Sequence, residues 1–92
     1  MTTFYPSVSV GTMDMGNPLD LVLDNSGPNN QALYEGTAYP ATAVTSGTAL
    51  WKIRKFFFDS NNLVMGWRWA DGSTEFNKDW SLRTTYTYEA LT

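Results

Sequence analysis

Residues 50–70 decide the fold, because they read as two strands around a turn: LWKIRKFFF (50–58), DSNN (59–62) and LVMGWRWA (63–70). Both apolar runs are rich in aromatic and β-branched or aliphatic residues, which favour extended backbone. The four residues between them are of the types that form turns. The stretch therefore predicts a β-hairpin.

Alternation along each run assigns its side chains to two faces of the predicted hairpin. The first run places one set of side chains on the expected core side: Trp51, Ile53 and Phe57. It places another set on the opposite side: Lys52, Arg54, Phe56 and Phe58. The second run gathers Leu63, Met65, Trp67 and Trp69 on one face, and we assign both Trp67 and Trp69 to the core. We expect Phe56 and Phe58 to be covered by the amino-terminal segment or by a partner.

Strand signals flank the hairpin on both sides. Residues 32–36 read as a strand, and residues 19–23 fit a strand better than a helical turn. Residues 82–88 alternate Thr and Tyr, which predicts a further strand. We expect an all-β protein with one antiparallel sheet curled into a small sandwich or barrel, because a flat sheet would leave its second aromatic face in water.

The chain divides at about residue 30. Residues 1–30 are punctuated by Pro, Gly and Asn, which allows only short ordered pieces, and we expect an extended amino-terminal arm there. Such an arm becomes ordered on a neighbour, or it frays as a loosely packed terminus. Residues 31–92 are expected to form a single β domain.

Small size makes association the expected support for this domain. A chain of 92 residues buries about 60–65 % of its surface on folding, and with neither Cys nor His it has no disulfide or zinc to stabilise it. Its aromatic content of 15 %, with four Trp, suits a homo-oligomer or docking onto a larger assembly. The alternative is that the aromatic residues fill the core of a free monomer. Our candidate protein-interface residues are Phe56, Phe58, Trp80, Tyr86 and Tyr88.

Charge and hydropathy argue against two classes of partner. The formal net charge of −3 gives no general attraction for nucleic acid. Basic and aromatic residues of the hairpin could still make a stacking surface for a single strand, although a solvated strand face is the favoured interpretation. No apolar run is long enough to cross a membrane, and the amino terminus lacks signal-peptide blocks, so we expect synthesis in the cytoplasm.

The sequence offers little to an enzyme. Without His or Cys there is no base or thiol for nucleophilic catalysis and no common transition-metal ligand. The carboxylate pairs Asp71 with Glu75 and Glu75 with Asp79 lie around a turn, where acidic residues are common. We expect no catalytic residue, no metal and no cofactor. A glycan-binding module is the rival from another class, since aromatic rings can stack on sugars; Trp80 and the tyrosines of residues 82–88 are its candidates.

A series of motifs resembles small proteins encoded by tailed bacteriophages: ALYEGTAYP (32–40), LWKIRK (50–55), WADG (69–72), FNKDW (76–80), then Arg83 and the Thr-Tyr run. Those proteins are usually taken for structural components of the virion. The resemblance implies a capsid decoration (cement) protein, or alternatively a neck, tail or fibre-associated protein. It implies the major capsid protein or other virion proteins as partners, and a virion location after synthesis in the host cytoplasm.

Overall fold

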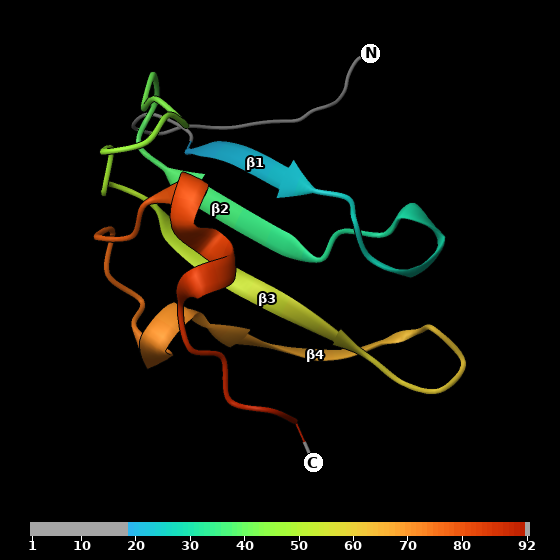
Figure 1. Ribbon diagram of the computed structural model, residues 1–92. Helices are drawn as coiled ribbons and strands as arrows, with labels where there is room; N and C mark the ends of the chain where they lie inside the picture. Colours follow the sequence, from blue (N-terminus) through green and yellow to red (C-terminus); the bar gives the residue numbers. More distant parts are fainter. Residues whose placement is uncertain (1–18, 92) are drawn as a thin grey trace.

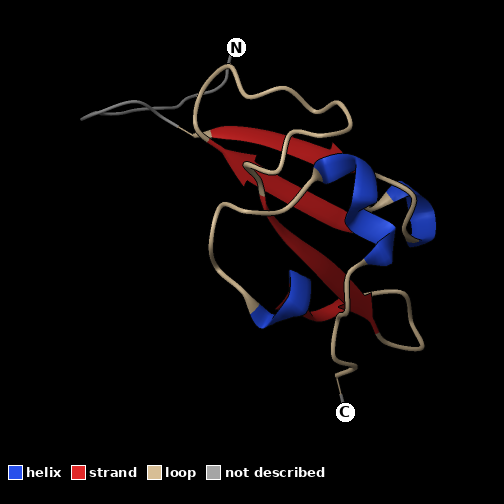
Figure 2. Cartoon of the chain, turned by 60° about the vertical axis from the view of Figure 1, so that its left-hand side comes forward, coloured by secondary structure: helices blue, strands red, loops and turns tan. Residues whose placement is uncertain are grey.

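The computed structural model describes residues 19–91, which form one four-stranded antiparallel sheet with its strands in chain order (Figure 1). The strands are β1 (Asp20–Asp24), β2 (Tyr34–Ala38), β3 (Lys52–Phe58) and β4 (Val64–Trp69). The helical segments are short 3-10 turns: η1 (Pro28–Asn30), η2 (Ala70–Gly72) and η3 (Trp80–Thr85). The all-β antiparallel class is confirmed. The sheet stays open, as a single layer of strands (Figure 2), instead of closing into a barrel.

The predicted hairpin is confirmed as β3 and β4. At its turn the Asp59 carboxylate accepts hydrogen bonds from the backbone N–H of Asn61 at 2.8 Å and of Leu63 at 3.0 Å. A side-chain acceptor of this kind replaces the missing backbone partners of a tight turn. Asn62 takes the left-handed backbone (φ 62°) that Asn tolerates better than most residues.

The strand expected in residues 19–23 is also confirmed. It forms β1, the edge strand, and pairs with β2 over its whole length, from Asp20 opposite Ala38 to Asp24 opposite Tyr34. The expected arm spans residues 1–30; its residues 1–18 lie outside the described part of the chain.

The strand predicted for residues 82–88 is wrong. The chain forms η3 there, and then continues without regular structure past Tyr88. Local hydrogen bonds explain the difference: the Asp79 carboxylate accepts from the backbone N–H of Ser81, and the Thr85 hydroxyl donates to the carbonyl of Leu82. Side chains that bond their own neighbouring backbone compete with a sheet ladder.

One face of the sheet, called the covered face, packs against η3, which passes in front of β2 and β3 in Figure 1. The buried residues of the core are Tyr34, Ala38, Trp51, Ile53, Ala70 and Trp80. The rings of Trp51 and Trp80 lie 6.3 Å apart between centroids. Trp80 can sit close to β2 because Gly36 has no side chain: a Cβ there would be 2.8 Å from the Trp80 ring.

A β-bulge between β3 and β4 corrects the expected position of two tryptophans. Phe58 pairs with Val64 but Phe57 pairs with Gly66, which leaves Met65 as an extra residue on β4. One extra residue moves all following side chains to the other face of the sheet. Trp67 is therefore paired with Phe56, and Trp69 with Arg54, on the face opposite the core.

Candidate docking face

The face of the sheet opposite η3, called the open face here, carries one set of side chains fixed by alternation and register. They are Leu21 and Leu23 of β1, Glu35 and Thr37 of β2, Lys52, Arg54 and Phe56 of β3, and Trp67 and Trp69 of β4. Several are large and apolar yet exposed: Leu21 by 60 %, Leu23 by 46 % and Trp67 by 46 %. Apolar side chains gathered in this way are typical of an interaction surface.

An arginine organises the middle of the open face. The Arg54 guanidinium forms an ion pair with the Glu35 carboxylate on the neighbouring strand. Its central carbon lies 4.5 Å from the ring centroid of Trp67, 5.0 Å from that of Phe56 and 5.6 Å from that of Trp69. Cation–π contacts and the ion pair thus bring the three rings and the two charges together at the centre of the face.

A second cation stands at one end of this arrangement. The Lys52 ammonium lies 5.1 Å from the ring centroids of both Trp69 and Phe76. Phe76 in turn packs on Tyr39, with centroids 5.0 Å apart. The segment after η2 thus extends the aromatic surface beyond the end of β4.

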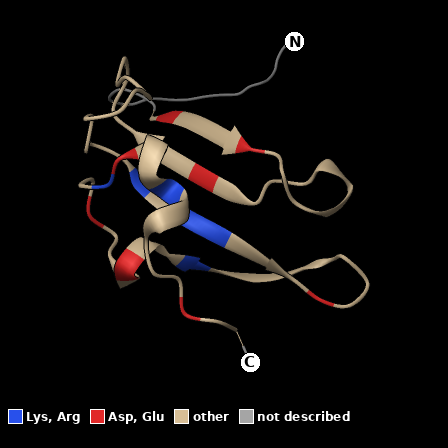
Figure 3. Cartoon of the chain, viewed as in Figure 1, with Lys and Arg blue, Asp and Glu red and all other residues tan. Residues whose placement is uncertain are grey.

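Charge is distributed across the sheet strand by strand. Figure 3 shows basic residues concentrated on β3, with acidic residues on β1 and β2. On the open face this gives an apolar strand, an acidic strand, a basic strand and an aromatic strand in that order, from Leu21 and Leu23 through Glu35 and Arg54 to Trp67.

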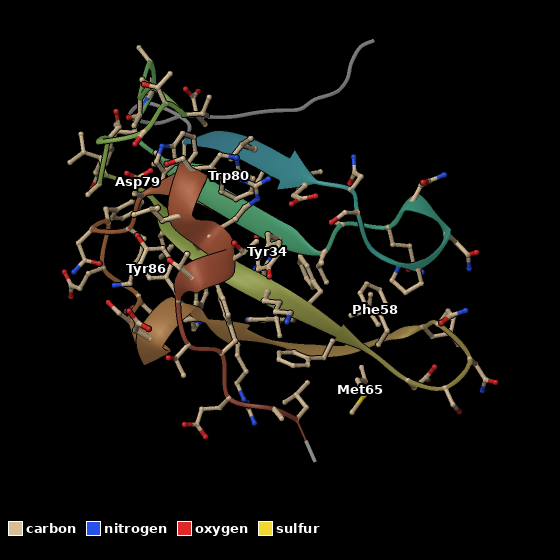
Figure 4. All side chains as sticks on the ribbon, in the orientation of Figure 1. Tyr34, Phe58, Met65, Asp79, Trp80 and Tyr86 are labelled. Atoms are coloured by element: carbon tan, nitrogen blue, oxygen red, sulfur yellow. The ribbon has the colours of Figure 1, made fainter. Side chains whose placement is uncertain are left out.

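The structure distributes the five candidate interface residues over three places. Phe56 lies on the open face, half-buried beneath Arg54. Phe58 is half-buried at the hairpin end, where its ring lies beside Gly27 of the β1–β2 connection (Figure 4). Trp80 is a core residue with 7 % exposure, which corrects its expected place on an exposed surface. Tyr86 and Tyr88 are half-buried and pack against the same core.

The two tyrosines are held by hydrogen bonds inside the domain. The Tyr86 hydroxyl accepts from the backbone N–H of Asp79 at 2.7 Å, and Figure 4 shows Tyr86 beside Asp79 and Trp80. The Tyr88 hydroxyl donates to the carbonyl of Arg83 at 2.7 Å. Burial raises the pKa of Tyr88 above its ordinary value, with the neighbouring Tyr34 adding to the effect. These contacts tie the carboxyl-terminal segment to the covered face.

The basic residues of the hairpin do not form one surface. Lys52 and Arg54 lie on the open face, whereas Lys55 pairs with Arg68 on the covered face. Lys55 stands 5.8 Å from the ring centroid of Tyr34 and 5.9 Å from that of Tyr88. The stacking surface considered for single-stranded nucleic acid is therefore divided between two faces.

The carboxylate of Asp79 serves as a structural cap. It accepts hydrogen bonds from the backbone N–H of Gly47 at 2.7 Å, the N–H of Ser81 at 2.9 Å and the Ser81 hydroxyl at 2.6 Å. The Ser81 hydroxyl and the Gly47 N–H hold the pKa of Asp79 below its usual range. This carboxylate links the loop of residues 39–49 to the start of η3.

A second acidic residue anchors the edge strand. Asp24 of β1 forms an ion pair with Arg83 of η3 at 2.8 Å. Burial raises the pKa of Asp24, but the hydrogen bonds from Arg83 and Ser26 and the charge of Arg83 outweigh it and lower the pKa overall.

Sequence reasoning missed Leu21, Leu23, Trp67 and Trp69 as surface residues of the open face. The leucines could have been found, since the alternation of residues 19–23 places Leu21 and Leu23 on one side of a strand. The face of the tryptophans depends on a bulge at Met65, and the isolated Gly66 beside it is a sequence signal for such a bulge that our strand assignment did not use.

Comparisons of this chain with models of protein families, with curated proteins and with solved structures gave no match. Within residues 19–91 the structure contains no helix with the length and apolar character of a membrane span. The same residues contain no group of three acidic, His or Cys side chains arranged to hold a metal ion.

Proposed function

We propose that this chain is a non-enzymatic structural component of a tailed-phage virion, and specifically a capsid decoration protein. The supporting observation is the open face, where exposed leucines and a tryptophan lie around an ion pair. A surface of this kind suits docking onto another protein, with apolar area for affinity and fixed charges for register. The virion setting comes from the motif resemblance of residues 32–88.

A neck, tail or fibre-associated position uses the same surface. Each of these positions repeats one weak contact many times by symmetry, so a small domain with a single docking face suffices. The partners are then the neighbouring virion proteins in place of the major capsid protein.

A glycan-binding module is the second candidate, and the exposure of Trp67 favours it. An exposed indole on a rigid sheet is the platform on which a sugar ring could stack. Against it, the Arg54 guanidinium stands 4.5 Å from the Trp67 centroid and takes up one face of that ring. Docking to protein therefore accounts for the arrangement better.

Co-sedimentation with capsids tests the proposal. The purified protein is mixed with mature capsids of the tailed phage that encodes it, and bound protein is quantified after centrifugation. Saturable binding at a fixed number of copies per capsid is expected. Two results together would replace the virion proposal with the glycan one. The folded protein would not bind capsids, tails or fibres, and it would bind a sugar on a glycan array with quenching of its tryptophan fluorescence.

Two single substitutions separate docking from folding. Trp67→Ser removes an exposed ring from the open face and is expected to abolish capsid binding while near-ultraviolet circular dichroism shows a folded core. Leu82→Ser is the matched control, because Leu82 is exposed by 44 % but lies on η3, at the opposite side of the sheet. Equal binding by both variants would exclude the open face as the docking surface.

A further inference from the structure

One row of side chains across the open face has apolar residues at both ends and opposite charges in its two middle positions. The register places Leu23 beside Glu35, Glu35 beside Arg54, and Arg54 beside Trp69. From β1 to β4 the row is therefore apolar, negative, positive and apolar. Such a row is complementary to a copy of itself turned end for end.

A two-fold axis lying between two facing sheets and parallel to their strands performs that turn. It stacks β1 of one copy on β4 of the other, and β2 of one copy on β3 of the other. Residues at the same height on the sheet remain at the same height, so Leu23 meets Trp69, and Glu35 meets Arg54, in both directions. A closed two-fold dimer uses one such self-complementary patch on each subunit.

We infer that the open face binds a second copy of this chain, face to face, about a two-fold axis parallel to the strands. The two ion pairs then form one network of four alternating charges at the centre, and Leu23 of each β1 covers the Trp69 indole of the other copy's β4. Facing sheets pack about 10 Å apart with strands about 30° from parallel, which these side chains can fill. The product is a β-sandwich built from two chains.

Charge complementarity is what selects a second copy over other occupants. The side chains of Arg54 and Glu35 keep 22 % and 16 % exposure, so both are partly desolvated before any partner arrives. A partner lacking charges at matching positions would bury them without new contacts, which is costly. A second copy supplies an acid over each base and a base over each acid.

The inference rests on the proposed function, which assigns the open face to contacts within an assembly, and it names a sister subunit as the occupant of that face. The dimer then meets the capsid through other surfaces, and a substitution on the open face weakens capsid binding because it breaks the dimer. The mass of the purified full-length protein in solution is the primary measurement, by light scattering and analytical ultracentrifugation. A dimer of twice the 10.3 kDa chain mass is expected at high micromolar concentration. A wild-type monomer at that concentration overturns the inference, and points instead to a face covered by residues 1–18 or by another protein.

Two charge reversals test the four-charge network. Glu35→Arg gives a row with two bases and Arg54→Glu gives a row with two acids, so each variant alone repels its own copy. Each is expected to weaken self-association by about tenfold or more. An equimolar mixture of the two is expected to restore a dimer containing one chain of each, because every base then faces an acid. Failure of the mixture to associate overturns the inference.

Matched controls carry the same change in net charge away from the open face. Glu89→Arg changes an exposed residue near the carboxyl terminus, and Arg68→Glu changes an exposed residue of β4 on the covered face. Both are expected to dimerise as the wild type does. Both reversal variants remain acidic overall, because each shifts the formal charge of −3 by only two units, so net charge does not draw them together.

A substitution outside the ion pair covers the case in which a reversal disturbs folding. Leu23→Asp alters an exposed side chain of the edge strand and is expected to give a folded monomer. An undiminished Leu23→Asp dimer overturns the inference. Capsid co-sedimentation separates the two proposals: a monomer that still binds capsids contradicts the dimer alone, and a dimer that ignores the virion contradicts the decoration function alone.

Discussion

Replacement of Gly36 by alanine tests the packing on which the covered face depends. A Cβ at this position would lie 2.8 Å from the Trp80 ring and 2.8 Å from a methyl group of Val22. Both neighbours are constrained, since Trp80 is buried and Val22 belongs to a paired strand. Overpacking of this kind destabilises the folded state by about 1–3 kcal/mol. Alanine loses less backbone entropy on folding than glycine does, which offsets about 0.5–1 kcal/mol of that loss. The expected net loss is about 1–2 kcal/mol.

For a domain of this size that loss lowers the midpoint of thermal unfolding by about 5–15 °C. Near-ultraviolet circular dichroism is a suitable probe, because Trp51 and Trp80 lie at the packed interface. Gly66→Ala is the matched control: its Cβ would meet only the end of the flexible Leu91 side chain, at 2.7 Å, so a change within about 0.5 kcal/mol is expected. A Gly36→Ala protein as stable as the wild type would show that the Trp80 ring does not need the space left by the missing side chain of Gly36.

Three further predictions concern stability. Phe58→Ser removes the half-buried ring that packs beside the β1–β2 connection. Urea titrations are expected to show a free energy of unfolding lower by about 1–3 kcal/mol. An unchanged urea midpoint would mean that the ring is exposed to solvent. Asp24 and Asp79 have lowered pKa values in the folded state, so the stability that they contribute is present above about pH 4 and is lost as the pH falls through their folded pKa values. The urea midpoint of unfolding, measured down to about pH 2, should therefore drop. The drop should be smaller in the Asp79→Asn variant, which has lost one of the two carboxylates. Tyr34 and Tyr88 have raised pKa values because of burial, so the folded state favours the neutral phenols and stability is lost as the pH rises above about 10. Phenolate absorbance should show these two groups ionising together with unfolding. Ionisation at their ordinary pKa while the protein remains folded would contradict their burial.

The hairpin and the edge strand could be predicted because their signals are local. Residues 50–58 and 63–70 combine β-favouring residues with a turn whose Asp59 supplies its own backbone hydrogen bonds. The alternation of residues 19–23 predicts β1 in the same way. The segment after Asp79 was mispredicted because its Thr and Tyr content favours a strand, whereas its hydrogen bonds run from side chain to nearby backbone and to the core.

The amino-acid sequence was enough to predict that the chain is all-β and that its centre is a hairpin, and it shows that the chain lacks Cys and His. These properties depend on composition and on the spacing of neighbouring residues. Which aromatic rings form the core and which remain exposed depends instead on the tertiary fold. A single extra residue at Met65 moves Trp67 and Trp69 to the open face. Because Gly36 has no side chain, the Trp80 ring can pack against β2 in the core. Face and burial depend on register and on contacts between distant segments, because each strand side is defined only by what packs against it.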